Sequence, residues 1–216
     1  MNRREFSAGA ACLLAAAALS PATLLAQGRQ PQEGTDYLAL KRPVNVSVAP
    51  GQVEVIEFFW YSCPHCNAFE PQLESWIKRL PPDVAMKRVP VAFREDFVPQ
   101  QRLYYTLEAL GKVDELHAKV FHAIHVERMP VSREDSILDW AGKQGLDKAK
   151  FTELYHSFDV VSKARRATQL QDAFQVQGVP AMGIAGRYYT DGTIAGNTDR
   201  MLQVTDYLIS QVRKKS

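Results

Sequence analysis

Hydrophobic positions change their spacing near residue 60 of the chain. Residues 53–60 form a nearly continuous apolar run rich in β-branched and aromatic residues, which predicts a strand covered on both faces. The next apolar side chains recur at helical spacing, and Pro81-Pro82 predicts the end of that helix. Its apolar residues are Phe69, Leu73, Trp76, Ile77 and Leu80. The pattern is therefore strand, tight turn, helix.

The middle of the chain predicts helices between two strand-forming segments. Residues 86–93 have the composition of a second strand, and residues 99–177 carry apolar side chains mostly at helical spacing. Within them, Ser132 followed by Asp135 resembles a capping box at a helix start. Strand signals return only at residues 181–190, where Gly186 predicts a hairpin, and a last helix is expected at residues 198–212.

The N-terminus has the pattern of a signal peptide. Arg3 and Arg4 precede an apolar stretch from Ala8 to Leu19, and Ala26 offers a small residue for cleavage. The stretch is shorter than the roughly 20 residues of a membrane span. We therefore predict that residues 1–26 direct export. Both the Sec and the twin-arginine routes remain open, because the two arginines also resemble a twin-arginine signal.

Removal of this segment would leave 190 residues, enough for one compact domain or one domain with a sizeable insertion. These residues would include 24 Lys and Arg against 23 Asp and Glu. The near balance of charge argues against nucleic acid as a partner.

Cys63 and Cys66 are the only cysteines outside the predicted signal peptide. A disulfide across two residues closes almost no loop, so a structural staple is not favoured. Structural zinc needs about four ligands, and there is no second cysteine pair. His122 and His125 lie far along the chain, and we interpret them as ordinary histidines. These residue types thus predict no metal and no cofactor, and they favour thiol chemistry in an oxidising compartment. A thiol-based metal carrier or binding module remains the alternative from another class.

The position of the two cysteines predicts unequal reactivity. Pro64 fits the first helical turn, which places Cys63 at the helix N-terminus. Unpaired N–H groups and the helix dipole stabilise a thiolate there. Cys66 lies one turn inside the helix and is expected to be the buried partner, while His65 adds a donor or a positive charge near Cys63. A stabilised thiolate favours the reduced form, so the disulfide should be an oxidant.

Glu57 lies in the middle of the apolar strand, where an unpaired carboxylate is costly to ionise. We interpret Glu57 as a proton acceptor near the buried Cys66 thiol. A solvent-facing position on an edge strand is the alternative.

A family resemblance rests on three short motifs in a fixed order. They are Glu57-Phe58-Phe59, Cys63-Pro64-His65-Cys66 and Gly178-Val179-Pro180. Together they resemble the DsbA family of thiol:disulfide oxidoreductases. The resemblance implies an α/β, thioredoxin-like fold interrupted by an inserted α-helical domain. Its boundaries are expected at residues 27–96 and 164–216 for the thioredoxin-like domain and at residues 97–163 for the insertion.

The resemblance also implies roles for individual residues. The bond before Pro180 should be cis and should face the Cys63 sulfur, and a buried basic partner for Glu57 is expected at Lys87 or Arg88. Substrate-binding residues are expected at Trp60, Pro64, Val179 and Met182. Candidates for an apolar surface around the reactive sulfur are Trp60, Met182, Tyr61, Phe93, Phe97 and Tyr188, and a place in the core is the alternative.

The activity implied is periplasmic donation of the Cys63–Cys66 disulfide to folding exported proteins by a monomer. A DsbB-like inner-membrane quinone reductase is the implied partner that reoxidises the dithiol. A disulfide isomerase or reductase of the same fold is the enzymatic alternative. Such proteins usually carry a separate dimerisation domain, for which residues 27–45 are too few.

Overall fold

The structure, a computed structural model, describes residues 29–214, so the predicted signal peptide lies outside the described residues. From Pro31 onward the described chain forms one compact unit. Its strands are β1 (Leu38–Ala39), β2 (Val53–Phe59), β3 (Val84–Pro90), β4 (Ala181–Ile184) and β5 (Tyr188–Asp191). Its helices are α1 (Pro64–Ile77), the 3-10 helix η2 (Glu95–Phe97), α2 (Val98–Ala109), α3 (Val113–His125), α4 (Glu134–Lys143), α5 (Lys148–Tyr155), α6 (Phe158–Ala173) and α7 (Thr198–Arg213).

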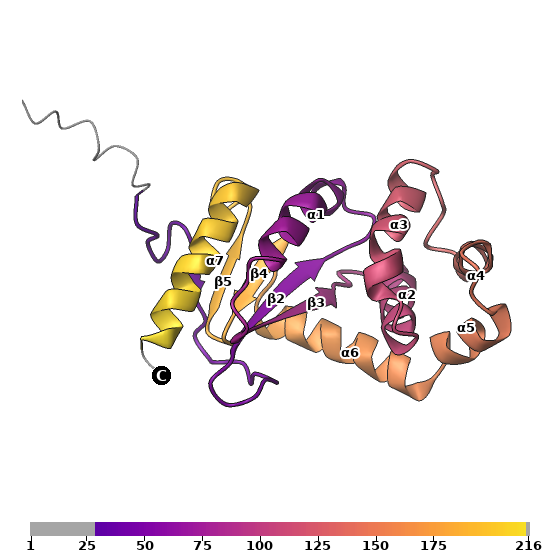
Figure 1. Cartoon of the computed structure of the whole chain (residues 1–216), viewed down its shortest axis with the longest axis horizontal. Helices are drawn as coiled ribbons and strands as arrows, with labels where there is room; N and C mark the ends of the chain where they lie inside the picture. The colour runs from indigo at the N-terminus through magenta and orange to yellow at the C-terminus, as the bar shows by residue number, and fades with distance from the viewer. Residues whose placement is uncertain (1–28, 215–216) are drawn as a thin grey trace, which may run out of the picture. The chain divides into compact units, whose positions relative to one another are not determined.

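The strands form one mixed sheet in the order β1-β5-β4-β2-β3 (Figure 1). β2 runs parallel to β3 and antiparallel to β4, and both remaining pairs are antiparallel. All seven residues of β2 are buried, as its apolar composition predicts. The register sets Glu57 between Arg88 of β3 and Met182 of β4.

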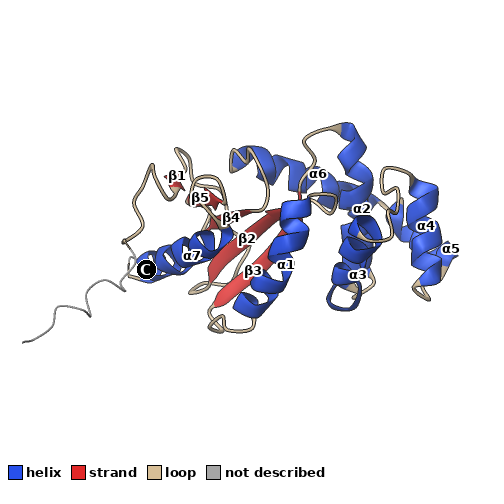
Figure 2. Cartoon of the chain, turned by 90° about the horizontal axis from the view of Figure 1, so that it is seen from above, coloured by secondary structure: helices blue, strands red, loops and turns tan. Residues whose placement is uncertain are grey.

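Helices cover both faces of this sheet. α1 and α7 lie on one face, and the end of α6 that leads into β4 lies on the other (Figure 2). Phe174, just after α6, packs its ring 5.2 Å from that of Phe58 on β2. A Cβ atom at Gly183 of β4 would lie 2.5 Å from the same Phe174 ring, so this close contact requires glycine.

The helices α2 to α5 pack together beyond the β3 side of the sheet (Figure 1), and α6 leads from them back to the strands. The prediction of an α/β fold with inserted helices is therefore confirmed. The expected border between residues 163 and 164 falls inside α6, which is continuous from Phe158 to Ala173.

Three local predictions were wrong. The second strand covers Val84–Pro90 instead of residues 86–93, since Val84 already pairs with Val53, and the last bond to β2 is the one that the Val91 N–H donates to Phe59. The first helix ends at Ile77, before Leu80. The N-cap of α4 is Arg133 and has no side-chain cap bond, so Ser132 does not begin a capping box. Among the described residues no helix is long and apolar enough to span a membrane.

Candidate active site

The two cysteines stand at the start of α1, and only Cys63 keeps access to solvent. Cys63 is the N-cap residue and Pro64 is the first helical residue, as the sequence predicts. The Cys63 side chain keeps some access to solvent, with the residue 7% exposed, whereas Cys66 is fully buried. Both are free thiols in this structure, which is therefore that of the dithiol form.

The surroundings separate the acidities of the two thiols. A hydrogen bond from the Cys66 thiol, with the backbone N–H groups of Cys66 and His65 and the nearby His65 side chain, lowers the pKa of Cys63 to about 6. Burial raises the pKa of Cys66 well above its usual range, and the neighbouring Cys63 sulfur raises it further. Cys63 is therefore a thiolate at neutral pH and Cys66 a thiol.

A distant loop lies against the reactive sulfur. The Val179–Pro180 peptide bond is cis, which confirms that prediction. The Cys63 Sγ atom lies 3.5 Å from the carbonyl oxygen of Val179, to which the thiol form donates a hydrogen bond. Pro180 is buried and His65 is exposed. Both line a cavity of about 320 Å³ between this loop and the start of α7.

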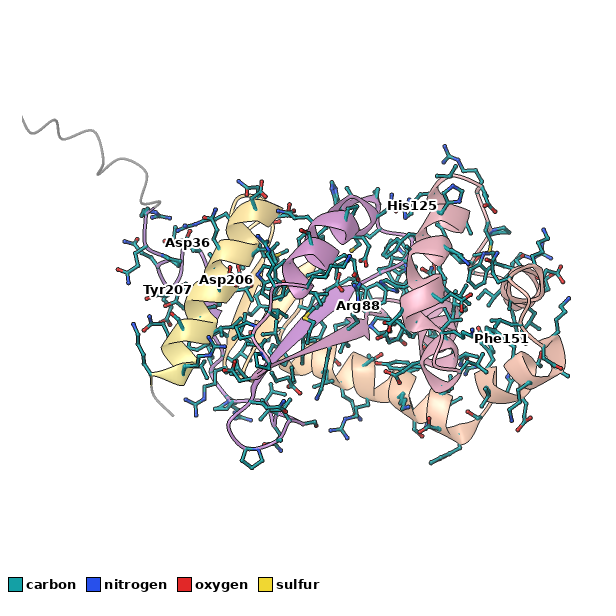
Figure 3. The ribbon with its side chains drawn as sticks, viewed as in Figure 1. Asp36, Arg88, His125, Phe151, Asp206 and Tyr207 are labelled. Carbon is teal, nitrogen blue, oxygen red and sulfur yellow. The ribbon has the colours of Figure 1, made fainter. Side chains whose placement is uncertain are left out.

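Behind Cys66, Glu57 and Arg88 form the centre of a buried ionic cluster. Glu57 is fully buried, and its Oε2 atom accepts a hydrogen bond of 3.0 Å from Nη1 of Arg88. The Arg88 guanidinium also donates to both carboxylate oxygens of Glu70 at 2.8 Å and to Glu74. Arg88 lies between α1 and the helices α2 and α3 (Figure 3). Lys87 instead pairs with Glu54, so Arg88 is the basic partner of Glu57.

The cluster holds its carboxyl groups in different protonation states. Burial raises the pKa of Glu57 to about 8, although Arg88 opposes this shift. Its Oε1 atom has no hydrogen-bond partner among the described residues. Against the cost of burial, its polar neighbours His117 and Arg88 lower the pKa of Glu70 to about 2. Glu57 is thus a group that can hold or release a proton near neutral pH beside the Cys66 thiol.

The aromatic surface near the sulfur is smaller than predicted. The indole of half-buried Trp60 stacks on Phe97 with ring centroids 3.9 Å apart, and Phe93 packs against Phe97 and remains 40% exposed. Met182 is fully buried between α1 and α7, so the prediction that its side chain binds substrate is wrong. Tyr61 is also fully buried, and half-buried Tyr188 packs against Tyr37 at the margin of the core under α7.

Sequence reasoning missed several residues at this site. Glu70 and His117 join the ionic cluster, Gln100 accepts hydrogen bonds from Ser62, and His125 contacts the backbone of Tyr61. The one signal in the sequence was the spacing of His117 and His125, which are eight residues apart and so share one face of α3. Within the described chain no group of three or more His, Cys, Asp or Glu side chains is arranged to hold a metal ion.

Three features of the described chain together define its class of enzyme. They are a five-stranded mixed sheet, a dithiol at a helix N-terminus in which Cys63 is acidic and Cys66 is buried, and a cis-proline loop against the Cys63 sulfur. They are the features of a thiol:disulfide oxidoreductase of the thioredoxin fold. The family model described as a DSBA-like thioredoxin domain matches residues 86–208. The chain belongs to this family.

Curated relatives agree with this assignment. Thiol:disulfide interchange protein DsbA of Bordetella parapertussis is 47% identical over 203 residues, which are 94% of this chain and 96% of that protein. The protein of the same name from Pseudomonas aeruginosa PAO1 is 38% identical over 204 residues, which are 93% and 96% of the two chains.

Solved structures show the same fold. The crystal structure of Pseudomonas aeruginosa DsbA matches with a TM-score of 0.80 at 39% identity and covers 84% of this chain and 94% of that chain. Oxidoreductase DsbA from Xylella fastidiosa matches with a TM-score of 0.80 at 28% identity, covering 85% and 98%. The chain is thus an oxidoreductase that exchanges thiols and disulfides.

Proposed function

We propose that this enzyme oxidises cysteine pairs of exported proteins in the periplasm, with Cys63 as the exchanging sulfur and Cys66 as the resolving one. The observation that carries the proposal is the separation of the two thiols, an accessible Cys63 with a pKa of about 6 and a buried Cys66 whose pKa is raised. A sulfur that is stable as a thiolate is a good leaving group, so the disulfide of this pair is readily given away.

The reaction begins when a substrate thiolate attacks the Cys63 sulfur of the Cys63–Cys66 disulfide. The new bond joins the substrate to Cys63, and Cys66 leaves as a thiolate that takes up a proton, which protonated Glu57 can supply. A second substrate thiolate then attacks the substrate sulfur of this mixed disulfide. The substrate leaves with a disulfide, and Cys63 leaves as a thiolate; two electrons have passed to the enzyme.

Reoxidation reverses the roles of these groups. The Cys63 thiolate attacks the disulfide of an oxidising partner, and the Cys66 thiol must lose its proton to resolve the mixed disulfide. Ionised Glu57 accepts that proton, and Arg88 stabilises the Glu57 carboxylate before the transfer through its hydrogen bond to Oε2. The family suggests a DsbB-like inner-membrane quinone reductase as the partner.

Substrate is proposed to bind across the start of α1 and the loop before β4. Pro64 and His65 are exposed there, Val179 is half-buried, and half-buried Trp60 offers part of its stacked indole. An extended substrate can pair with the Val179 backbone as an added strand, beside Pro180, which has no N–H. We propose that the enzyme acts as a monomer after removal of residues 1–26.

The test uses the chain without residues 1–26 in two measurements. Equilibration in glutathione buffers of known potential gives the redox potential of the Cys63–Cys66 couple. Mixing the oxidised protein with a peptide that carries two cysteines shows whether it oxidises them. The oxidised protein should form the peptide disulfide stoichiometrically, and Cys63→Ser should abolish the reaction. A couple as reducing as that of thioredoxin, about −270 mV, would contradict the oxidant assignment and favour a reductase. Tight binding of one zinc ion by the reduced protein without peptide oxidation would favour the metal carrier.

Export is tested separately in the producing cell. The enzyme should appear in the periplasmic fraction, shortened at its N-terminus. Replacement of Arg3 and Arg4 by Lys should block export if the twin-arginine route is used, and should leave it intact if the Sec route is used.

A further inference from the structure

The loop that carries Cys63 is tied to the inserted helices by three polar side chains. Gln100 on α2 accepts hydrogen bonds of 3.1 Å from the backbone N–H and the hydroxyl of Ser62. On α3, Nε2 of His125 lies 2.8 Å from the carbonyl oxygen of Tyr61, and Nδ1 of His117 lies 2.8 Å from the Tyr61 hydroxyl. Figure 3 shows His125 on the side of α3 that faces α1. Residues far along the chain thus hold the two positions before Cys63.

His117 differs from Gln100 and His125 because it also contacts a charged residue outside the Cys63 loop. Its Nε2 atom lies 2.7 Å from Nη1 of Arg88. Every guanidinium nitrogen is a donor, so Nε2 must be the unprotonated ring nitrogen, and the proton is on Nδ1, which donates to the Tyr61 hydroxyl. His117 is therefore neutral. Burial and the Arg88 charge lower the pKa of His117, in agreement with this state.

The ring of His117 is held by packing as well as by hydrogen bonds. The residue is 4% exposed, and its ring makes edge contacts with Phe59, Tyr104 and Phe121 at centroid distances of 5.1, 6.0 and 5.3 Å. The carboxylate of Glu70 lies 3.5 Å from Nε2, and Nη1 of Arg88 donates to both groups. An imidazole fixed in this way can transmit the position of one hydrogen-bond partner to the other.

We propose that His117 is a positioning residue for thiol–disulfide exchange, joining the Cys63 loop through Tyr61 to the Glu57 cluster through Arg88. One ring nitrogen fixes the loop that sets Cys63 at the helix N-terminus. The other fixes the counter-charge of the carboxyl group that serves Cys66. The inserted helices thereby set the relative position of the exchanging sulfur and the buried proton acceptor. The inference rests on the proposed exchange reaction.

The experiment compares His117→Phe, Tyr61→Phe and the double variant, all of which retain an aromatic ring. His122→Phe is the matched control, because His122 lies on the same helix and is exposed, and its ring pairs with Glu127 away from the Cys63 loop. Two quantities are measured, the rate at which the oxidised protein oxidises a two-cysteine peptide and the midpoint of the Cys63 thiolate absorbance against pH. The second does not depend on substrate, so it tests the positioning role even if the wild-type protein fails to oxidise the peptide.

His117→Phe should slow peptide oxidation by about tenfold and raise the thiolate midpoint, since a small displacement of a reacting group costs one to two orders of magnitude in rate. Tyr61→Phe should change both in the same direction. The double variant should be no slower than the slower single variant, because both changes break one connection. His122→Phe should behave as wild type.

Wild-type rates and wild-type thiolate midpoints in both His117→Phe and Tyr61→Phe would overturn the proposal, even if the urea midpoint fell, because His117 would then contribute only stability. Fully additive rate losses in the double variant would overturn it as well. If His117→Phe does not fold, His117→Gln takes its place, since the Gln oxygen can still accept from Arg88. A wild-type rate and midpoint in Tyr61→Phe would then refute the connection to the Cys63 loop.

Discussion

Cys63 and Val179 meet across the active site, with the sulfur 3.5 Å from the carbonyl oxygen although the residues lie 116 positions apart. Cys63 is at the start of α1, which packs on the face of the sheet that includes β2. Val179 is just before β4, which pairs with the edge of β2. The sheet therefore brings the exchanging sulfur and the proposed substrate-binding backbone together. This arrangement lets one sulfur be reached by an extended chain while the second remains buried.

The first prediction concerns the source of the Cys63 acidity. The hydrogen bond from Cys66 is the largest cause of the lowered pKa, ahead of the contributions of His65. Cys66→Ala should therefore raise the thiolate midpoint of Cys63 more than His65→Ser does. Cys66→Ser retains a hydroxyl donor and is the matched control, which should stay close to wild type. Equal midpoints in the Ala and Ser variants would show that the hydrogen bond has no role.

Stability of the dithiol form should depend on pH in a definite direction. The folded-state pKa of Cys63 is about 6, below the value of about 8.5 in an unfolded chain. The thiolate therefore stabilises the folded dithiol protein at alkaline pH, and this contribution is lost as the pH falls through about 6. Urea unfolding should show the reduced form more stable than the oxidised form at pH 8, with the difference shrinking by pH 5. A difference that is constant over this range would contradict the prediction.

Glu57 should act in the opposite sense on stability. Its folded-state pKa is raised to about 8, so the folded protein loses stability as the pH rises from about 4.3, the unfolded value, through 8. Glu57→Gln has no such group, and its stability relative to wild type should increase over this interval, by on the order of 1 kcal/mol per pH unit. Urea unfolding at pH 5 and pH 8 measures this. A variant equally destabilised at both values would place an ionised Glu57 in the folded protein throughout.

Arg88 and its neighbour Lys87 should differ strongly when replaced. Arg88→Met leaves Glu57 and Glu70 buried without their counter-charge, which typically costs about 3–5 kcal/mol in the free energy of unfolding. The Lys87 side chain is 36% exposed and is the counter-charge of one buried carboxylate, Glu54, which also accepts from the Ser47 N–H, so Lys87→Met should cost less than Arg88→Met. Denaturant titration of both variants at neutral pH gives the comparison. Similar losses in the two would mean that the cluster around Arg88 adds no more than the single pair of Lys87 and Glu54.

The close contact between Gly183 and Phe174 predicts sensitivity to a single methyl group. A Cβ at Gly183 would lie 2.5 Å from the Phe174 ring, so Gly183→Ala should destabilise the fold by about 1–3 kcal/mol. Gly192→Ala is the control, because its Cβ would meet its nearest neighbour at an ordinary 4.0 Å. A second substitution, Phe174→Leu, should recover part of the loss in Gly183→Ala. No recovery would locate the strain elsewhere.

The sequence could predict the chemistry of the cysteines because the cause is local. The apolar run of β2, the proline after Cys63 and the helical spacing beyond it determine where the sulfur lies relative to the helix N-terminus. Glu57 could be identified in the same way, as a charge inside an apolar strand. The choice between Lys87 and Arg88 needed the register, since the two side chains leave β3 on opposite faces.

Contacts between distant segments could not be predicted in this way. Met182 looked like a surface residue beside the reactive loop, but β4 is covered on both faces, and the alternation of side chains does not say which face is near solvent. His117 and Gln100 contact the active site only because α2 and α3 pack beside α1. Nothing in the spacing of residues 98–125 specifies that docking.

The continuous helix α6 has a mechanical consequence for how this chain can vary. Its 16 residues span about 24 Å from the inserted helices to Phe174, whose ring is fixed against Gly183. One added residue inside α6 would turn everything beyond it by about 100° and move it by about 1.5 Å. The Phe174 ring would then no longer pack against Gly183. Changes in length can be absorbed in the turns between α3 and α4 or between α4 and α5. The length of α6 is therefore set by the packing at its two ends.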